Sequence, residues 1–255
     1  MSRRIPLAVL LVFGICLVSI GRAEAQTTTV LVNGSFGDAP VAWMEPGNSE
    51  QMFEAIANTY GQSPVQSYWS PNDAVFPPFY SDIDSGGYQL AGVLTSIGGD
   101  VNVITHSHGG NVAIWSTHLM NRPIRHLINM GTPINWDLPG GLANAGAYSR
   151  CQVSSSADWV QFAGASPYQI GNFAYSVYQS IAGAVNAFQA LIAGDYSGAL
   201  AYFWISTFEA IEAEYWWYTT KIEVQGPTYM FSGLSHSEIR QPPVWNAIAP
   251  YCATN

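Results

Sequence analysis

Apolar and polar positions along this chain follow the pattern of strands that alternate with helices. Short runs of β-branched and apolar residues predict buried strands, at residues 28–32, 65–69, 101–104, 124–129, 151–154 and 228–231. Apolar positions three and four apart predict helices, at residues 49–60 and 88–97 and from Val112 onward. Because strands alternate with helices, we expect an α/β fold with a mostly parallel central sheet flanked by helices.

A long helical pattern interrupts this alternation before the last predicted strand. Apolar residues recur along it in two stripes, one formed by Ala174, Tyr178, Ile181, Val185, Phe188 and Ile192 and the other running from Leu200 to Tyr215. Gly194 is suited to end the first helix, and Asp195 is suited to cap the second. We therefore expect a helical cap inserted at about residues 165–222. Its apolar faces either pack on the core or contact a substrate as the aromatic underside of the cap.

The first 25 residues have the features of a secretory signal peptide. Arg3 and Arg4 form a positive start, residues 5–20 are apolar and uncharged, and small residues around Ala25 suit cleavage. The apolar run is shorter than the roughly 20 residues that a spanning helix needs. We expect a secreted or periplasmic protein whose single mature domain covers residues 26–255.

Charge narrows the range of partners. The whole chain has a formal net charge of −9, and residues 26–255 hold five basic and sixteen acidic residues, a net charge near −11. Such a chain repels nucleic acid and anionic lipid, so a neutral or apolar substrate fits better. The cap adds a second expected contact, with a lipid interface. Oligomeric state is not readable from the sequence.

Two cysteines, Cys151 and Cys252, remain after the signal peptide. In an oxidising compartment they can form one bridge, which in the chain-entropy model contributes about 4–5 kcal/mol for a loop of this size. Two separate buried thiols are the alternative, because spacing alone does not determine pairing.

The strand at residues 101–104 leads directly into a short turn centred on Ser107. Thr105, His106 and His108 flank the serine, and Gly109 and Gly110 precede the helix. A strand, a sharp turn and a helix are the context in which a serine oxygen is lifted out of the backbone path as a nucleophile. The helix N-terminus beneath it favours developing negative charge.

A serine hydroxyl needs a base to accept its proton and an acid to orient that base. His236, just after the last predicted strand, is the expected base, since His118 and His126 fall within a helix and a strand. Asp158, a few residues beyond a strand, is the expected acid, and Asp137 is the alternative.

An oxyanion hole needs two backbone N–H groups. One is expected at His108, directly after the serine, and the other at Ser35 or Phe36, after the turn at Gly34. His106 and His108 are too few to form a metal site, and no carboxylate or cysteine lies beside them in sequence. We expect no metal and no cofactor.

Together these motifs resemble the α/β-hydrolase superfamily, and more narrowly its lipase- and esterase-like members. The resemblance covers most of residues 26–255 and is carried by residues 30–36, 68–70, 105–111 and 131–133, with Asp158 and His236. Two departures are Thr105, where a glycine usually opens the turn, and Asn33, where a histidine is common. The resemblance implies ester hydrolysis through an acyl-enzyme on a small-molecule or lipid ester. A hydrolase of amides or thioesters, and a non-catalytic binding protein on the same scaffold, are the alternatives.

Overall fold

The computed structural model describes residues 27–34, 49–67, 80–134, 146–221 and 226–254. These residues form one sheet of six parallel strands in the order β2-β1-β3-β4-β5-β6. The strands are β1 (Thr28–Val32), β2 (Val65–Ser67), β3 (Val101–His106), β4 (Ile124–Met130), β5 (Ala147–Ser155) and β6 (Thr228–Phe231). The expected parallel sheet flanked by helices is confirmed.

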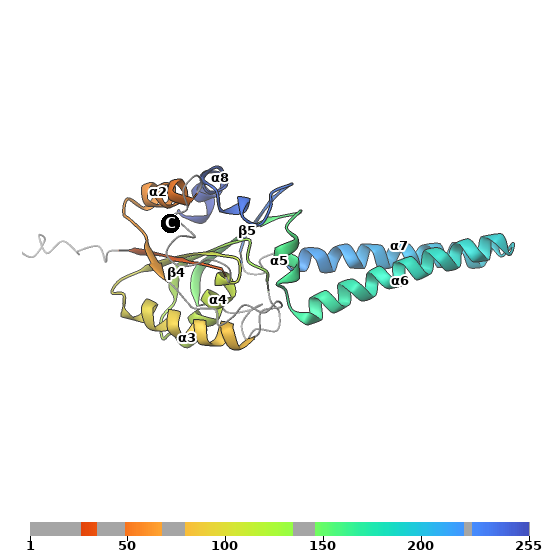
Figure 1. Ribbon diagram of the computed structural model, residues 1–255, viewed down its shortest axis with the longest axis horizontal. Helices are drawn as coiled ribbons and strands as arrows, with labels where there is room; N and C mark the ends of the chain where they lie inside the picture. Colours follow the sequence, from red (N-terminus) through yellow and green to blue (C-terminus); the bar gives the residue numbers. More distant parts are fainter. Residues whose placement is uncertain (1–26, 35–48, 68–79, 135–145, 222–225, 255) are drawn as a thin grey trace, which may run out of the picture.

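Helices cover both faces of the sheet (Figure 1). Helices α3 (Tyr80–Ser96) and α4 (Gly109–Leu119) cover one face, and α2 (Ser49–Tyr60) and α8 (Pro242–Cys252) cover the other. Successive side chains of a strand point to opposite faces, so Val30 and Val32 join the first core while Leu31 joins the second. Both faces are buried, and the inner strands bury polar residues such as Asn102, Asn129 and Gln152 as well as apolar ones.

Strands β3 and β4 extend one or two residues past their predicted ends, and two other elements are much longer than expected. Helix α3 begins at Tyr80 rather than at residue 88, because Gly86 and Gly87 do not end it. A Cβ at Gly87 would lie 2.1 Å from Cδ1 of Trp115, so the glycine allows α3 to approach α4. Strand β5 covers nine residues rather than four, since it pairs along β4 on one side and β6 on the other.

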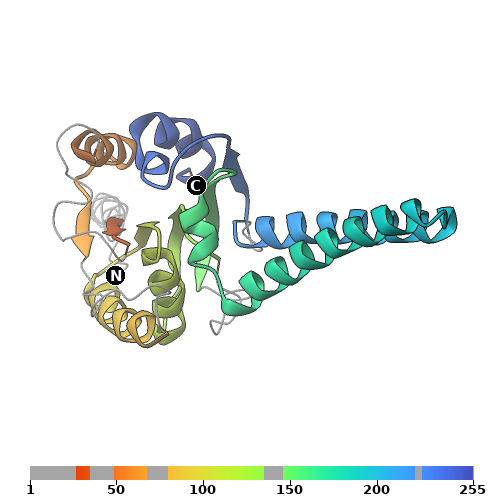
Figure 2. The ribbon, with the colours of Figure 1, turned by 45° about the vertical axis from the view of Figure 1, so that its right-hand side comes forward.

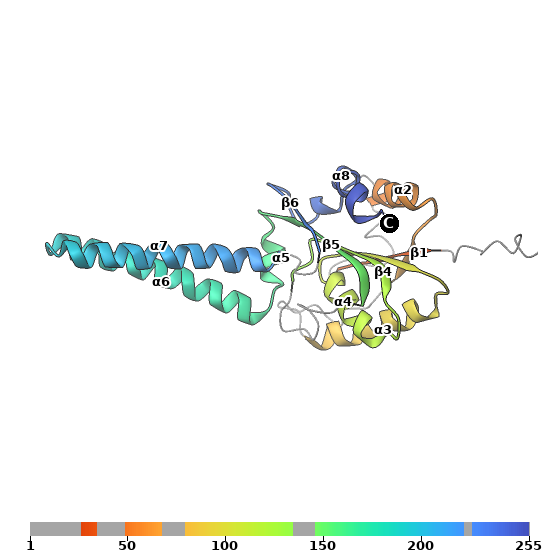
Figure 3. The same ribbon diagram turned by 180° about the vertical axis from the view of Figure 1, so that it is seen from behind.

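The insertion before β6 contains α5 (Trp159–Ala163), α6 (Pro167–Ile192) and α7 (Tyr196–Thr219). Asp195 caps α7 by accepting a hydrogen bond from the Gly198 N–H, and Gly194 has a positive φ of 80°, as expected of the residues between the two helices. Figures 1 and 3 show α6 and α7 side by side as a long hairpin that extends away from the sheet.

The expectation that the α6 stripe packs on the core is wrong. Tyr178, Ile181 and Phe188 are 67%, 60% and 64% exposed. The partner of α6 is α7 rather than the body of the molecule, and α7 contacts the opposite, small-residue face of α6. Helical periodicity therefore identified a real stripe, and of the two alternatives for its surroundings the core is excluded.

Cys151 of β5 and Cys252 at the end of α8 are joined by a disulfide, with their Cα atoms 5.8 Å apart. The bond ties the C-terminal helix to an inner strand of the sheet, in the core that Trp245 and Ile248 also fill.

Candidate active site

Ser107 lies in a strained turn between β3 and α4. It has a φ of 55°, and among the described residues it is the only one other than glycine with a positive φ. Its N–H donates to the Met130 carbonyl at 3.0 Å, and its carbonyl accepts from the Gly110 N–H at 3.0 Å. One bond joins the turn to β4 and the other starts the helix. Backbone strain at a serine between a strand and a helix is the geometry of a nucleophile elbow.

Three glycines allow the chain to approach this turn closely. A Cβ at Gly109 would lie 2.3 Å from the Asn33 carbonyl oxygen, and a Cβ at Gly110 would lie 2.1 Å from Oγ1 of Thr132. A Cβ at Gly34 would lie 2.5 Å from the Cβ of Ser107. The turn after β1, which the sequence predicts to supply an oxyanion-hole donor, is therefore in contact with the serine.

Thr105 takes the place of the glycine that usually opens such a turn. Its Oγ1 donates to Oδ1 of Asn129 on β4 at 2.8 Å, and its side chain is fully buried. The threonine thus links the elbow strand to its neighbour and leaves the positive φ at Ser107 intact.

The structure brings the predicted base and acid together. Nδ1 of His236 lies 2.7 Å from Oδ2 of Asp158, and the Asp158 side chain has no solvent-exposed surface. Oδ1 of the same carboxylate accepts from the Gln161 N–H at 2.9 Å as the N-cap of α5. Because an ionised carboxylate only accepts, Nδ1 carries the proton and Nε2 is left as the acceptor.

His236 is held beside the elbow through its backbone and its ring. Nε2 of His106 lies 3.0 Å from the His236 carbonyl oxygen, and the two imidazole rings are 4.7 Å apart. A Cβ added to Gly131, the residue after Met130, would lie 3.3 Å from Nδ1 of His236, so the imidazole packs closely against the backbone at the end of β4. Nε2 of His236 is buried and has no hydrogen-bond partner among the described residues. An acceptor with no partner next to the serine turn is what a general base requires, and such bonds are often long without substrate.

The two histidines beside Ser107 are neutral. Burial lowers the pKa of His108 to about 4, with a further contribution from nearby His236, and burial also holds the pKa of His106 well below its usual range. Nδ1 of His108 lies 3.2 Å from the amide nitrogen of Asn111, within the first turn of α4. Their rings therefore act as packed, hydrogen-bonded groups. His108 stands at the N-cap of α4, where its backbone N–H is the expected oxyanion donor.

Lys221, which the sequence reasoning did not single out, supports the acid. It is fully buried, and Nζ donates to the backbone carbonyls of Ser155 at 2.9 Å and Asp158 at 2.6 Å. Nζ also lies 4.3 Å from the ring centre of Trp217, and burial lowers the lysine pKa to about 8. The only signal in the sequence was that this chain has a single lysine, at the end of a helix.

The base of the hairpin borders the site. Four aromatic side chains pack where α5, α6 and α7 meet, namely Trp159, Phe162, Phe173 and Trp217. A Cβ on Gly164, which follows α5, would lie 2.8 Å from Nε2 of His108. The Thr220 carbonyl accepts from the Ile134 N–H at 2.8 Å, so the end of α7 is tied to the loop after β4. The rest of the hairpin extends away from the sheet (Figure 2).

Three residues predicted for the site, Ser35, Phe36 and Asp137, lie outside the described residues. Of the other histidines, His118 lies in the last turn of α4, and His126 is buried in β4. Within the part of the chain that the structure describes, no group of three or more histidine, cysteine and carboxylate side chains is placed to hold a metal ion.

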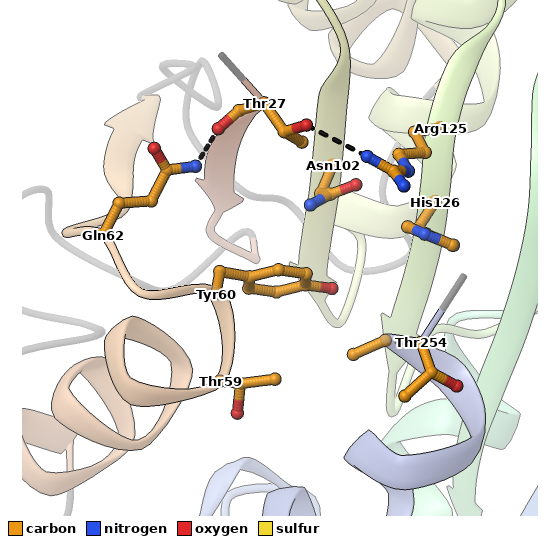
Figure 4. A pocket seen from close by; sticks show the side chains of 9 residues that line it. Thr27, Thr59, Tyr60, Gln62, Asn102, Arg125, His126 and Thr254 are labelled. Carbon is orange, nitrogen blue, oxygen red and sulfur yellow. Dashed lines mark hydrogen bonds between the residues drawn. The ribbon is translucent and has the colours of Figure 1, made fainter. Parts of the chain in front are cut away.

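A separate cavity of about 360 Å³ lies at the amino ends of the strands, whereas Ser107 lies at their carboxyl ends (Figure 4). Tyr60, Asn102, Arg125 and His126 line it, and Thr27 accepts hydrogen bonds from Gln62 and Arg125. These residues lie where strands β3 and β4 begin, whereas ligands of open α/β sheets bind outside the carboxyl ends of the strands. The cavity is distinct from the candidate active site.

No family model and no curated protein matches this chain. Solved structures with similar backbones include two proteins assigned to the alpha/beta hydrolases, from Xanthomonas campestris pv. campestris (18% identity, 52% of this chain and 73% of the other, TM-score 0.40) and Agrobacterium tumefaciens (12%, 91% and 85%, 0.47). A third is an alpha/beta serine hydrolase without a lid from Xanthomonas campestris (11%, 91% and 85%, 0.44).

Because these TM-scores lie below 0.5, the fold assignment rests on the chain's own features. They are six parallel strands, a strained serine between β3 and α4, an aspartate after β5 and a histidine after β6. In the α/β-hydrolase fold the nucleophile, acid and base follow one another along the chain in that order. The fold of this chain is the α/β-hydrolase fold.

Proposed function

We propose that this chain is a secreted serine hydrolase that cleaves carboxylic esters in the manner of lipases and esterases. The observation that carries the proposal is the 2.7 Å hydrogen bond between His236 and the buried carboxylate of Asp158, beside the strained Ser107. A buried carboxylate that fixes one imidazole nitrogen leaves the other free to accept the serine proton. The turn between β3 and α4 presents that serine at the carboxyl edge of the sheet.

In the proposed mechanism Ser107 Oγ attacks the ester carbonyl while Nε2 of His236 accepts the hydroxyl proton. Asp158 stabilises the resulting imidazolium, and the His108 N–H donates to the tetrahedral oxyanion. His236 then gives the proton to the departing alcohol, which leaves an acyl-enzyme on Ser107. Water, deprotonated by His236, hydrolyses that ester and restores the free serine. The second oxyanion donor is proposed from Ser35 or Phe36, since Gly34 contacts Ser107.

Charge and covalent structure support the choice of substrate and compartment. The net charge of residues 26–255, near −11, favours a neutral ester over an anionic one. The disulfide between Cys151 and Cys252 suits an oxidising compartment, as does a cleaved signal peptide at residues 1–25.

The test is a panel of p-nitrophenyl esters of increasing acyl length, with matched anilides and thioesters, assayed on the wild type and Ser107→Ala. We expect turnover of esters and its loss in the variant. Ser116→Ala is a matched control, because Ser116 is another buried serine, whose hydroxyl donates within α4 to the Ala113 carbonyl. Equal turnover by the Ser107 variant would refute the assignment, and hydrolysis of anilides or thioesters alone would refute the ester specificity.

A further inference from the structure

The α6–α7 hairpin is the most unusual surface of this molecule. A helix of 26 residues is about 39 Å long, and most of this length extends past the body without contacting it (Figures 1 and 2). Its exposed large apolar side chains include Tyr175, Tyr178, Ile181, Val185, Phe188, Leu191, Ile192, Tyr196, Leu200, Tyr202, Phe203, Trp204, Ile205, Phe208, Ile211 and Tyr215.

Small and hydroxyl-bearing residues occupy the contact between the two helices. A Cβ on Gly183 would lie 3.0 Å from the Ser206 backbone nitrogen, and Ser180 Oγ donates to the Ser206 carbonyl at 2.9 Å. Ser176 and Ala213 are likewise buried. A helix pair in water buries its large apolar side chains and exposes its polar ones. Helices in an apolar phase join through small residues and interhelical hydrogen bonds, with large side chains outward, and this hairpin has that arrangement.

The apolar surface surrounds the hairpin rather than forming one face. Phe203 and Ile205 are two positions apart and therefore about 160° apart around α7, yet they are 56% and 47% exposed. If each of the exposed large apolar side chains listed above contributes on the order of 100 Å², the exposed apolar area of the hairpin is about 1,500 Å². A second copy in a standard interface covers about 800 Å² per partner and would leave the far side in water. The hydrocarbon of a lipid surface, in contrast, can cover the apolar side chains on every side of the hairpin.

The charged residues of the hairpin indicate which kind of lipid surface it can bind. Helix α6 contains no charged residue, and neither helix contains lysine or arginine. The acidic residues of the hairpin are Asp195 at the tip and three glutamates, at positions 209, 212 and 214, in the half of α7 nearer the body. Anionic headgroups bind through basic side chains, which are lacking here, so neutral headgroups fit. Among the described residues no helix is long and apolar enough to cross a membrane.

We propose that the outer part of the hairpin, residues 178–208, lies lengthwise within a neutral lipid surface without crossing it, so that its apolar side chains enter the hydrocarbon and Asp195 at its tip stays among the headgroups. The body then stays at the surface, with Ser107 near the base of the hairpin. Binding depends on buried apolar area and not on salt. It is independent of the proposed chemistry, so a Ser107→Ala protein binds as the wild type does and the two proposals can fail separately.

The test is flotation of full-length Ser107→Ala protein with phosphatidylcholine vesicles at low and high salt. We expect flotation at both. Replacing Phe188, Phe203 and Phe208 together by Gln lowers the partition coefficient at least about 100-fold, because three buried aromatic side chains are lost. The matched control replaces Tyr88, Tyr148 and Tyr251, exposed aromatics of the body, by Gln and leaves flotation unchanged.

Three results would overturn the proposal. The first is a folded protein that does not float, and the second is binding that requires phosphatidylserine or disappears in salt. The third is a stable dimer in solution that the Phe variant dissociates and that never binds vesicles, because a second copy would then be the partner. Circular dichroism on the Phe variant establishes that the helices remain, since its substitutions lie on exposed positions.

Discussion

Replacing Lys221 with Met tests whether this buried lysine positions the catalytic acid. Methionine retains an apolar stem of similar length and removes the ammonium group that donates to the Ser155 and Asp158 carbonyls. Both carbonyls keep a backbone donor, from the Asp158 N–H and the Phe162 N–H respectively. The substitution therefore removes hydrogen bonds without leaving a buried acceptor wholly unpaired.

The expected loss follows from these contacts. Hydrogen bonds to a charged group contribute about 1.5–3 kcal/mol each, and the contact with Trp217 adds up to about 2 kcal/mol. Relief from the desolvation of a fully buried ammonium offsets part of this. We expect the free energy of unfolding to fall by about 2–4 kcal/mol. A displacement of Asp158 by about 1 Å lowers kcat about 100-fold with little change in KM, since the base is then misoriented.

Urea unfolding and ester kinetics measure the two effects. Arg125→Met is the control, because Arg125 is a half-buried cation at the other edge of the sheet, 3.9 Å from an exposed aspartate, and its removal costs about 1 kcal/mol or less. Wild-type kcat in a Lys221→Met protein would refute the positioning role, even if stability fell.

Lys221 also predicts a pH dependence of stability. Burial lowers its pKa in the folded protein to about 8, below the ordinary value of 10.5. Between these values the unfolded chain binds more protons, so the free energy of unfolding rises as the pH increases from about 8 to 10.5. Lys221→Met removes that slope, and a slope that persists in the variant must come from another group.

Three further predictions concern other parts of the molecule. His108 titrates near 6.5 in the unfolded chain, whereas its folded pKa is about 4, so urea unfolding should show that this residue contributes a loss of stability of up to about 3 kcal/mol by pH 4. His108→Asn removes that part and leaves the part due to His106, whose pKa burial also lowers; an acid loss as large as that of the wild type contradicts this. Gly34→Ala places a methyl group against Ser107 and lowers kcat/KM at least about 100-fold, whereas Gly98→Ala, with open space, does not; equal activity of both refutes the contact. Cys151→Ser with Cys252→Ser opens a link between residues 101 positions apart and lowers the free energy of unfolding by about 4–5 kcal/mol, as calorimetry in oxidising buffer measures; an unchanged melting temperature contradicts it.

Local sequence patterns were sufficient for the sheet and for the serine turn. Strand Thr28–Val32 is a run of β-branched and apolar residues, and a parallel strand buried on both faces produces that pattern, whereas the edge strand Thr228–Phe231 is only partly buried. The turn at Ser107 is encoded within a few residues by Gly109 and Gly110, whose close contacts with Asn33 and Thr132 explain why no side chain is tolerated there. Chain order then predicted Asp158 and His236, whose side chains the structure places 2.7 Å apart, because parallel strands end at a common edge.

Contacts between residues far apart in the sequence could not be predicted from these local patterns. Periodicity identifies an apolar face of α6 but not what the face meets, so the sequence left packing on the core and contact with a substrate both open. The three glycines in α3 lower its helical propensity, and for Gly87 only the contact with Trp115 on another helix shows why a glycine is there. Lys221 reaches the acid across more than 60 residues of sequence, and a lone lysine gives no indication of its partners.

The reactivity of a single hydroxyl tests the account most directly. Intact-mass spectrometry after treatment with a fluorophosphonate, followed by peptide mapping, should find one phosphonyl group per chain on Ser107. The adduct should be absent from Ser107→Ala, and it should form at least about 1,000-fold more slowly in Asp158→Asn, where His236 is no longer held in the required tautomer. An adduct on another serine, or none on a folded wild-type protein, would contradict the assignment of Ser107, His236 and Asp158 as a catalytic unit.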